Sequence, residues 1–171
     1  MKIDLFIVLA ALGILVGCSG SPTETASSPS ASSGKRLLLA SEPDGAIPVG
    51  EARQTVQSDQ EVTLVGLVGG STEPFVDGIA AFTIVDESVP YCSPDEGCPT
   101  PWDYCCKQNQ VQDNIATIKI VDEAGSPIAS NARDLIGVEG LSKVVVQGRA
   151  TRDDAGNLSV AATKIFIRPG E

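Results

Sequence analysis

The sequence predicts an all-β domain: a small five-stranded barrel with one short helix and a cysteine-rich insertion between the second and third strands. Segments rich in β-branched residues follow one another from Glu61 to Ile167, and clusters of Gly, Asp and Asn that favour turns separate them. The chain has 171 residues, enough for one ordinary domain and too few for two sizeable ones.

The strands can be placed in order along the chain. We expect them over Val62–Val68, Ala81–Asp86, Ala116–Asp122, Lys143–Ala150 and Leu158–Ile167. In the fourth strand Val146 alternates with Val145 and Gln147, so we expect Val146 to point into the core. Asp153–Asn157 has the composition of a hairpin loop. The only helical candidate is Asn131–Gly140, whose apolar side chains can cap one end of the barrel.

Five strands with a short helix between the third and fourth resemble the OB-fold, a small Greek-key barrel. The resemblance covers Glu51–Arg168 and depends on Gly66 in the first strand, the Val-Asp ending of the second, and the Val-Val-Val-Gln-Gly-Arg run after Gly140. It implies an OB-like barrel domain over residues 51–171 and names no ligand. A generic β-sandwich is the alternative architecture. Residues 35–50, where Pro43, Gly45 and Pro48 break any long element, are expected to form an irregular lead-in.

The insertion at residues 86–114 is acidic, with six acidic side chains against one lysine, and it contains Cys92, Cys98, Cys105 and Cys106. A structureless loop of this length is improbable in a compact domain, so we expect the cysteines to hold it together. Two disulfides would pair Cys92 and Cys98 with Cys105 and Cys106 in either order, because a bond between the adjacent cysteines is strained. The alternatives are a thiolate site for zinc or copper and redox cycling of the adjacent pair.

Two aromatic residues, Trp102 and Tyr104, lie between the second and third cysteines of the insertion. Exposed aromatic side chains on a stapled loop are good anchors, so both are candidate contacts for a partner. Alternatively, they cover the disulfides and the open end of the barrel.

The first residues have the features of a secretory signal peptide over residues 1–17, with Lys2 before an apolar run from Leu5 to Val16. The end of this run, Leu-Val-Gly followed by Cys18, resembles the lipobox of bacterial lipoproteins. The resemblance implies that Cys18 carries acyl chains such as palmitate and anchors the protein to a membrane. Residues 18–34, rich in Ser, Thr and Pro, are then a flexible tether, as in small envelope lipoproteins of bacteria.

The amino-acid composition excludes or disfavours several classes of function. The formal net charge is −10, which disfavours nucleic-acid binding. The chain contains no histidine, which excludes Ser-His-Asp triads and His-ligated zinc. We find no arrangement of nucleophile, base or phosphate loop, so the sequence predicts a protein that is not an enzyme.

These observations together predict a lipid-anchored protein of the bacterial cell envelope, facing the periplasm or the exterior. In the first interpretation it is a non-catalytic module that binds a ligand, a glycan or an envelope protein, with a disulfide-stapled loop and no cofactor. The alternative is a lipoprotein that binds zinc or copper through the four cysteines.

Overall fold

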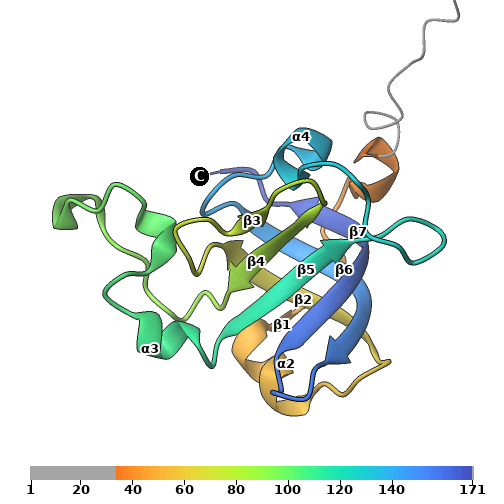
Figure 1. Ribbon diagram of the computed structural model, residues 1–171, viewed down its shortest axis with the longest axis horizontal. Helices are drawn as coiled ribbons and strands as arrows, with labels where there is room; N and C mark the ends of the chain where they lie inside the picture. Colours follow the sequence, from red (N-terminus) through yellow and green to blue (C-terminus); the bar gives the residue numbers. More distant parts are fainter. Residues whose placement is uncertain (1–33, 171) are drawn as a thin grey trace, which may run out of the picture.

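The structure, a computed structural model, describes residues 34–170 (Figure 1). The predicted signal peptide, the predicted lipidation site Cys18 and nearly all of the predicted tether lie outside the described residues. Within the described part, no helix has the length and apolar character needed to cross a membrane.

Five strands close into a barrel, which confirms the predicted fold class. They are β2 (Glu61–Val68), β4 (Ala81–Val85), β5 (Ile115–Ile120), β6 (Lys143–Arg152) and β7 (Leu158–Ile167). Around the barrel the order is β2-β4-β5-β7-β6 and back to β2, and every pair is antiparallel except β5–β7. With α4 (Ala132–Ile136) between the third and fourth of these strands, the topology is that of an OB-like Greek-key barrel. Two short strands, β1 (Ile47–Pro48) and β3 (Phe75–Val76), pair with β2 and β4.

The main hydrophobic core fills the barrel, and β2 shows why the alternating pattern was informative. Its residues alternate between buried and partly exposed along the strand, as expected for one face toward a core. Val146 of β6 is fully buried in the same core, so its predicted inward orientation is confirmed. Gly66 lets β2 approach β4, because a Cβ at this position would lie 2.8 Å from the carbonyl oxygen of Val85.

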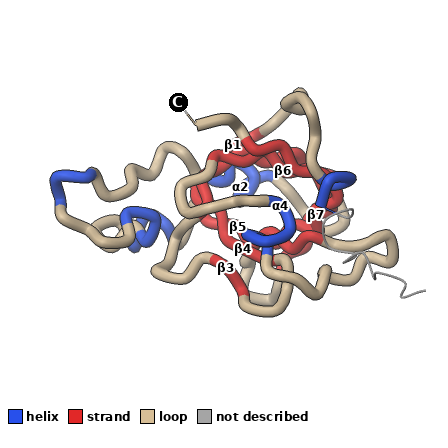
Figure 2. Tube along the Cα trace, turned by 90° about the horizontal axis from the view of Figure 1, so that it is seen from above, coloured by secondary structure: helices blue, strands red, loops and turns tan. Residues whose placement is uncertain are grey.

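The helix α4 closes one end of the barrel, as the sequence predicted (Figures 1 and 2). The side-chain oxygen of Asn131 accepts a hydrogen bond of 2.9 Å from the backbone N–H of Arg133, which caps the first turn. Gly137, with φ of 73°, ends the helix in the left-handed conformation. Four apolar residues of this region lie in the core: Ala132, Leu135, Ile136 and Val138.

A second helix, α2 (Val49–Thr55), lies at the opposite end of the barrel, so the prediction of a single helical segment at Asn131–Gly140 was wrong (Figure 1). Pro48 precedes this helix and makes no side-chain cap. The carboxylate of Asp86 caps it instead, because its Oδ2 accepts a hydrogen bond of 2.7 Å from the N–H of Gly50. The cap comes from 36 residues away, which is why no local pattern indicated the helix.

The lead-in is irregular only in part. Residues 34–37 form a helical turn, and Leu37 is buried in the barrel core. The N–H of Leu39 donates a hydrogen bond of 2.8 Å to the carbonyl oxygen of Ile165 in β7. The expected lead-in at residues 35–50 therefore packs against the barrel and ends in β1 and the start of α2.

Candidate metal centre

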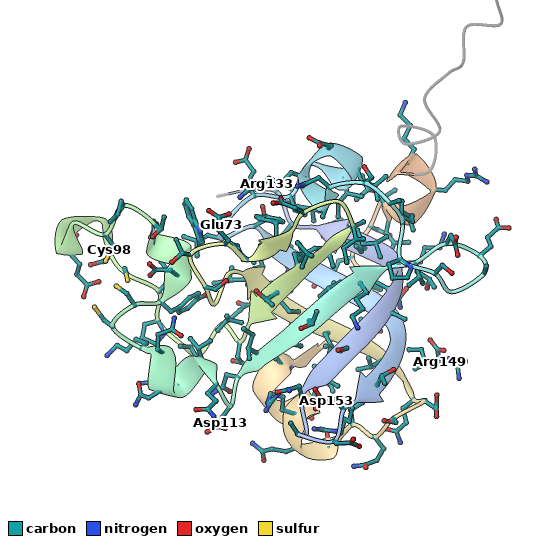
Figure 3. All side chains as sticks on the ribbon, viewed as in Figure 1. Glu73, Cys98, Asp113, Arg133, Arg149 and Asp153 are labelled. Atoms are coloured by element: carbon teal, nitrogen blue, oxygen red, sulfur yellow. The ribbon has the colours of Figure 1, made fainter. Side chains whose placement is uncertain are left out.

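The insertion between β4 and β5 extends sideways from the barrel (Figure 1), and Cys98 lies in its outer part (Figure 3). It contains two 3₁₀ turns, η1 (Pro94–Glu96) and η2 (Pro101–Asp103), and the short helix α3 (Gln108–Val111). The insertion therefore has local structure of its own, as its length required.

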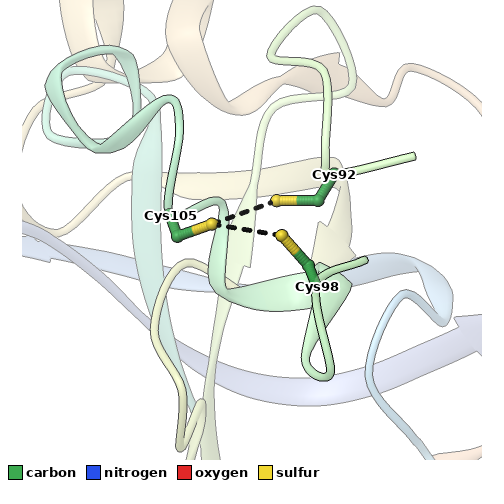
Figure 4. Close-up of side chains that lie close together, drawn as sticks. All are labelled: Cys92, Cys98 and Cys105. Carbon is green, nitrogen blue, oxygen red and sulfur yellow. Dashed lines mark hydrogen bonds between the residues drawn. The ribbon is translucent and has the colours of Figure 1, made fainter. Parts of the chain in front are cut away.

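Three of its cysteines converge (Figure 4). The Sγ atom of Cys105 lies 3.4 Å from that of Cys92 and 3.3 Å from that of Cys98. All three sulfur atoms lie within 4.8 Å of one another, so this group can hold a metal ion. The Sγ of Cys106 lies 3.7 Å from that of Cys105 and is not a member of the group. All four cysteines have free thiols, and these separations exceed the roughly 2.05 Å of a disulfide.

Two tight turns bring the three sulfur atoms together. Cys92 and Cys98 flank η1, where the N–H of Ser93 donates a hydrogen bond of 2.6 Å to the carboxylate of Glu96 in a capping box. The second turn ends at Tyr104, whose φ of 54° reverses the chain and presents Cys105 to the other two thiols.

The carboxylate of Asp103 holds the second turn from inside. One of its oxygens accepts a hydrogen bond of 2.8 Å from the N–H of Cys105. The other accepts a hydrogen bond of 2.8 Å from the hydroxyl of Thr100. Both oxygens are therefore occupied in folding the turn that positions Cys105.

Burial and protonation differ among the three thiols. Cys92 is buried, Cys98 is partly exposed and Cys105 is exposed. Hydrogen bonding with the thiols of Cys98 and Cys105 lowers the pKa of Cys92. Hydrogen bonding to the Cys98 and Cys92 sulfurs raises the pKa of Cys105. A first thiolate is thus favoured at Cys92, and further thiolates so close to it would repel one another without a cation.

A second, smaller hydrophobic cluster joins the insertion to the barrel. It consists of Val85, Val89, Tyr104 and Val111, with Ile115 packed against it. The Tyr104 side chain is fully buried and its hydroxyl makes no hydrogen bond within the described chain. Burial raises the pKa of Tyr104 far above its usual value. The expectation that Tyr104 is an exposed partner contact is therefore wrong, because its ring is needed inside this cluster.

Trp102 has a covering role as well, although it remains partly exposed. Its indole N–H donates a hydrogen bond of 3.1 Å to the carbonyl oxygen of Thr72, and its own carbonyl oxygen accepts one of 2.8 Å from Gly70. The ring lies against Gly140, where a Cβ would come within 2.6 Å of it. These contacts support the covering interpretation for Trp102.

The sequence identified the cysteines and did not identify the part played by Asp86. This residue begins the insertion and is the one buried charged residue of the described chain. Besides capping α2 through Gly50, its carboxylate accepts hydrogen bonds of 2.9 Å and 2.7 Å from the N–H and hydroxyl of Ser88. Burial alone would raise the pKa of Asp86, but these hydrogen bonds hold it below the usual value. The carboxylate thus ties the start of the insertion to α2.

Comparisons with known proteins give structural similarity and no relatives. No protein-family model matches the chain, and no curated protein matches it. Among solved structures, the hypothetical protein ygiW from E. coli is 11% identical, with 77% of this chain and 95% of that chain covered and a TM-score of 0.38. An aspartyl-tRNA synthetase from Entamoeba histolytica is 8% identical, covering 97% of this chain and 28% of that chain, with a TM-score of 0.42. A putative aspartyl-tRNA synthetase from Leishmania major Friedlin is 10% identical, with 80% of this chain and 24% of that chain covered and a TM-score of 0.43. The fold assignment accordingly depends on the strand order of the barrel itself.

Proposed function

We propose that this protein is a metal-binding module in which Cys92, Cys98 and Cys105 hold zinc or copper as thiolates. The observation that supports the proposal is the convergence of three sulfur atoms within 4.8 Å of one another. Thiolate sulfur is a preferred ligand of zinc and of Cu(I). The barrel serves as the rigid base from which the insertion presents these thiols.

Distances favour a metal site over disulfides. An ion with metal–sulfur bonds of about 2.3 Å keeps its thiolate ligands about 3.8–4.0 Å apart. Cys105 Sγ lies 3.3 Å and 3.4 Å from its two neighbours, so the sulfurs need to spread by about half an ångström to receive the ion. To form a disulfide, either pair must instead close by about 1.3 Å.

A disulfide-stapled module that binds a partner protein or glycan is the second candidate. The side chain of Tyr91, next to Cys92, is 46% exposed, and it supplies the aromatic anchor that such a module needs. In this case a bond between Cys105 and Cys92 or Cys98 would stiffen the loop that carries Tyr91.

For location and chemistry we propose a lipid-anchored protein of the bacterial envelope, attached through Cys18 and facing the periplasm or the exterior. The lipobox-like residues before Cys18 support this location. We propose no catalytic activity for either candidate. The net charge of −10 argues against nucleic acid as a partner.

The experiment begins with the full chain purified from the envelope in mild detergent. Bound zinc and copper are measured by mass spectrometry, and free thiols are counted by alkylation before and after chelation. We expect one ion per chain, and thiols at Cys92, Cys98 and Cys105 that react only after chelation. Cys92→Ser and Cys105→Ser should each lose the ion. Asn109→Ser, at an exposed position of α3, is the matched control and should retain it.

The opposite result is equally definite. An intact mass about 4 Da below that of the fully reduced chain, with no alkylatable thiol and no stoichiometric metal, would show two disulfides. That outcome rejects the metal-binding function and supports the stapled partner-binding module.

A further inference from the structure

We infer that the metal centre takes Cu(I), bound by Cys92, Cys98 and Cys105 in a three-coordinate site from which Cys106 is excluded. The inference rests on the proposed function and goes further, because it names the ion and the number of ligands. Zinc and Cu(I) both accept thiolates, and the number of available ligands separates them.

The described chain brings three ligands to this point and no fourth. Of its Cys, Asp and Glu side chains, only the three thiols form a group with mutually close ligand atoms. The entire sequence contains no histidine. Structural zinc sites almost always have four protein ligands in a tetrahedron. A soft, monovalent d¹⁰ ion such as Cu(I) is satisfied by three thiolates, so the ligand count favours it.

The two groups closest to becoming a fourth ligand are both restrained. The Sγ of Cys106 lies 3.7 Å from that of Cys105 but outside the group of three converging sulfur atoms. Consecutive residues rarely bind one ion comfortably. The two oxygens of Asp103 accept hydrogen bonds from Cys105 and Thr100, so turning this carboxylate to an ion would undo the turn that presents Cys105.

Two of the three thiols leave a bound ion accessible from solvent. Cys92 is buried, whereas Cys98 is partly exposed and Cys105 is exposed. A three-coordinate ion on the outer part of the insertion is open to attack by a thiolate from another molecule. Binding breaks three S–H bonds and forms three Cu–S bonds, releases three protons to the buffer and leaves copper in the +1 state throughout.

The test uses the reduced full chain in detergent under nitrogen, with Cu(I) supplied against bathocuproine disulfonate as a competing chelator. We expect an X-ray absorption spectrum with about three sulfur neighbours around copper. Cys106→Ser should bind Cu(I) within about threefold of the unmodified chain, whereas Cys105→Ser should bind at least about 100-fold more weakly. One equivalent of Cu(I) should displace bound zinc completely.

Each contrary result has a separate meaning. About four sulfur neighbours, together with a loss of more than about tenfold in the Cys106→Ser variant, would overturn the three-coordinate site and leave the metal-binding function standing. Retention of zinc against Cu(I) would overturn the choice of ion in the same way. Failure of the reduced, unmodified chain to bind either ion would reject the proposed function itself. The absorption spectrum is recorded on the unmodified chain, so this arm does not depend on how a variant folds.

Discussion

Asp86 provides the sharpest test of how the insertion is joined to the barrel, and the change to make is Asp86→Asn. The carboxylate is buried and accepts three hydrogen bonds, from the N–H of Gly50 and from the N–H and hydroxyl of Ser88. Asparagine keeps the shape but has one acceptor oxygen, and its amide NH₂ must face donors. A hydrogen bond to a charged group contributes about 1.5–3 kcal/mol, and a neutral one about 0.5–1.5 kcal/mol. We therefore expect a loss of about 2–4 kcal/mol in the free energy of unfolding at pH 7.

The pH dependence of this loss identifies the carboxylate as its source. Because the pKa of Asp86 is lowered in the folded chain, the unfolded chain binds more protons between the two pKa values, and stability rises with pH there. The contribution is fully present above the unfolded value of about 3.9 and is lost as the pH falls through the folded value. The difference in the free energy of unfolding between the original chain and Asp86→Asn should therefore be constant from pH 7 to about pH 5 and decrease below about pH 4.

The assay is urea unfolding of both chains at several pH values, with reductant and chelator present so that the thiols stay in one state. For each chain the free energy of unfolding is plotted against pH. The difference between the two plots removes the contributions of the other carboxylates, which both chains share. Glu87→Gln is the matched control: the neighbouring Glu87 is exposed, forms ion pairs with Lys143 and Arg168, and should change stability by about 0–1 kcal/mol. The reasoning would be refuted if Asp86→Asn lost less than about 1 kcal/mol in the free energy of unfolding at pH 7. It would also be refuted if this loss stayed unchanged down to pH 2.5.

Three further changes test the core, the insertion and the anchor. Val146→Asp places an unpaired charge in the barrel core and should remove several kcal/mol of a typical 5–15 kcal/mol; an unchanged melting temperature would contradict the inward placement of Val146. Tyr104→Phe removes a buried hydroxyl that has no hydrogen-bond partner in the described chain, so thermal unfolding should show equal stability or a gain of about 1 kcal/mol; a clear loss would mean that the hydroxyl is satisfied. Cys18→Ser should abolish acyl labelling and move the protein out of the detergent phase, and unchanged labelling and partitioning would reject lipid anchoring.

The barrel could be predicted because the sequence patterns that indicate its strands, turns and connecting helix each lie within a few residues. In β2 buried and exposed residues alternate, whereas in β6 Val144, Val145 and Val146 are all buried and only Val144 and Val146 belong to the barrel core. Asp153–Asn157 supplies the turn between β6 and β7, where the Asp153 side chain accepts hydrogen bonds from the N–H groups of Ala155 and Asn157. Strand, turn and connecting helix each have a signal within a few residues. Their order along the chain was then sufficient to indicate the OB-like topology.

The geometry of the site could not be predicted in the same way, because it depends on contacts between residues far apart in the sequence. The helix α2 has seven residues, too few to be stable alone, and it forms where the barrel brings Asp86 to the N–H of Gly50. Tyr104, an aromatic residue in a loop, was a candidate for an exposed anchor. It is buried because it packs with Val85 and Val111 in the folded insertion. The sequence by itself determined that four thiols and an acidic loop would occur together. Only the tertiary structure decided which three thiols meet, because the spacing between cysteines does not specify how two turns orient their side chains.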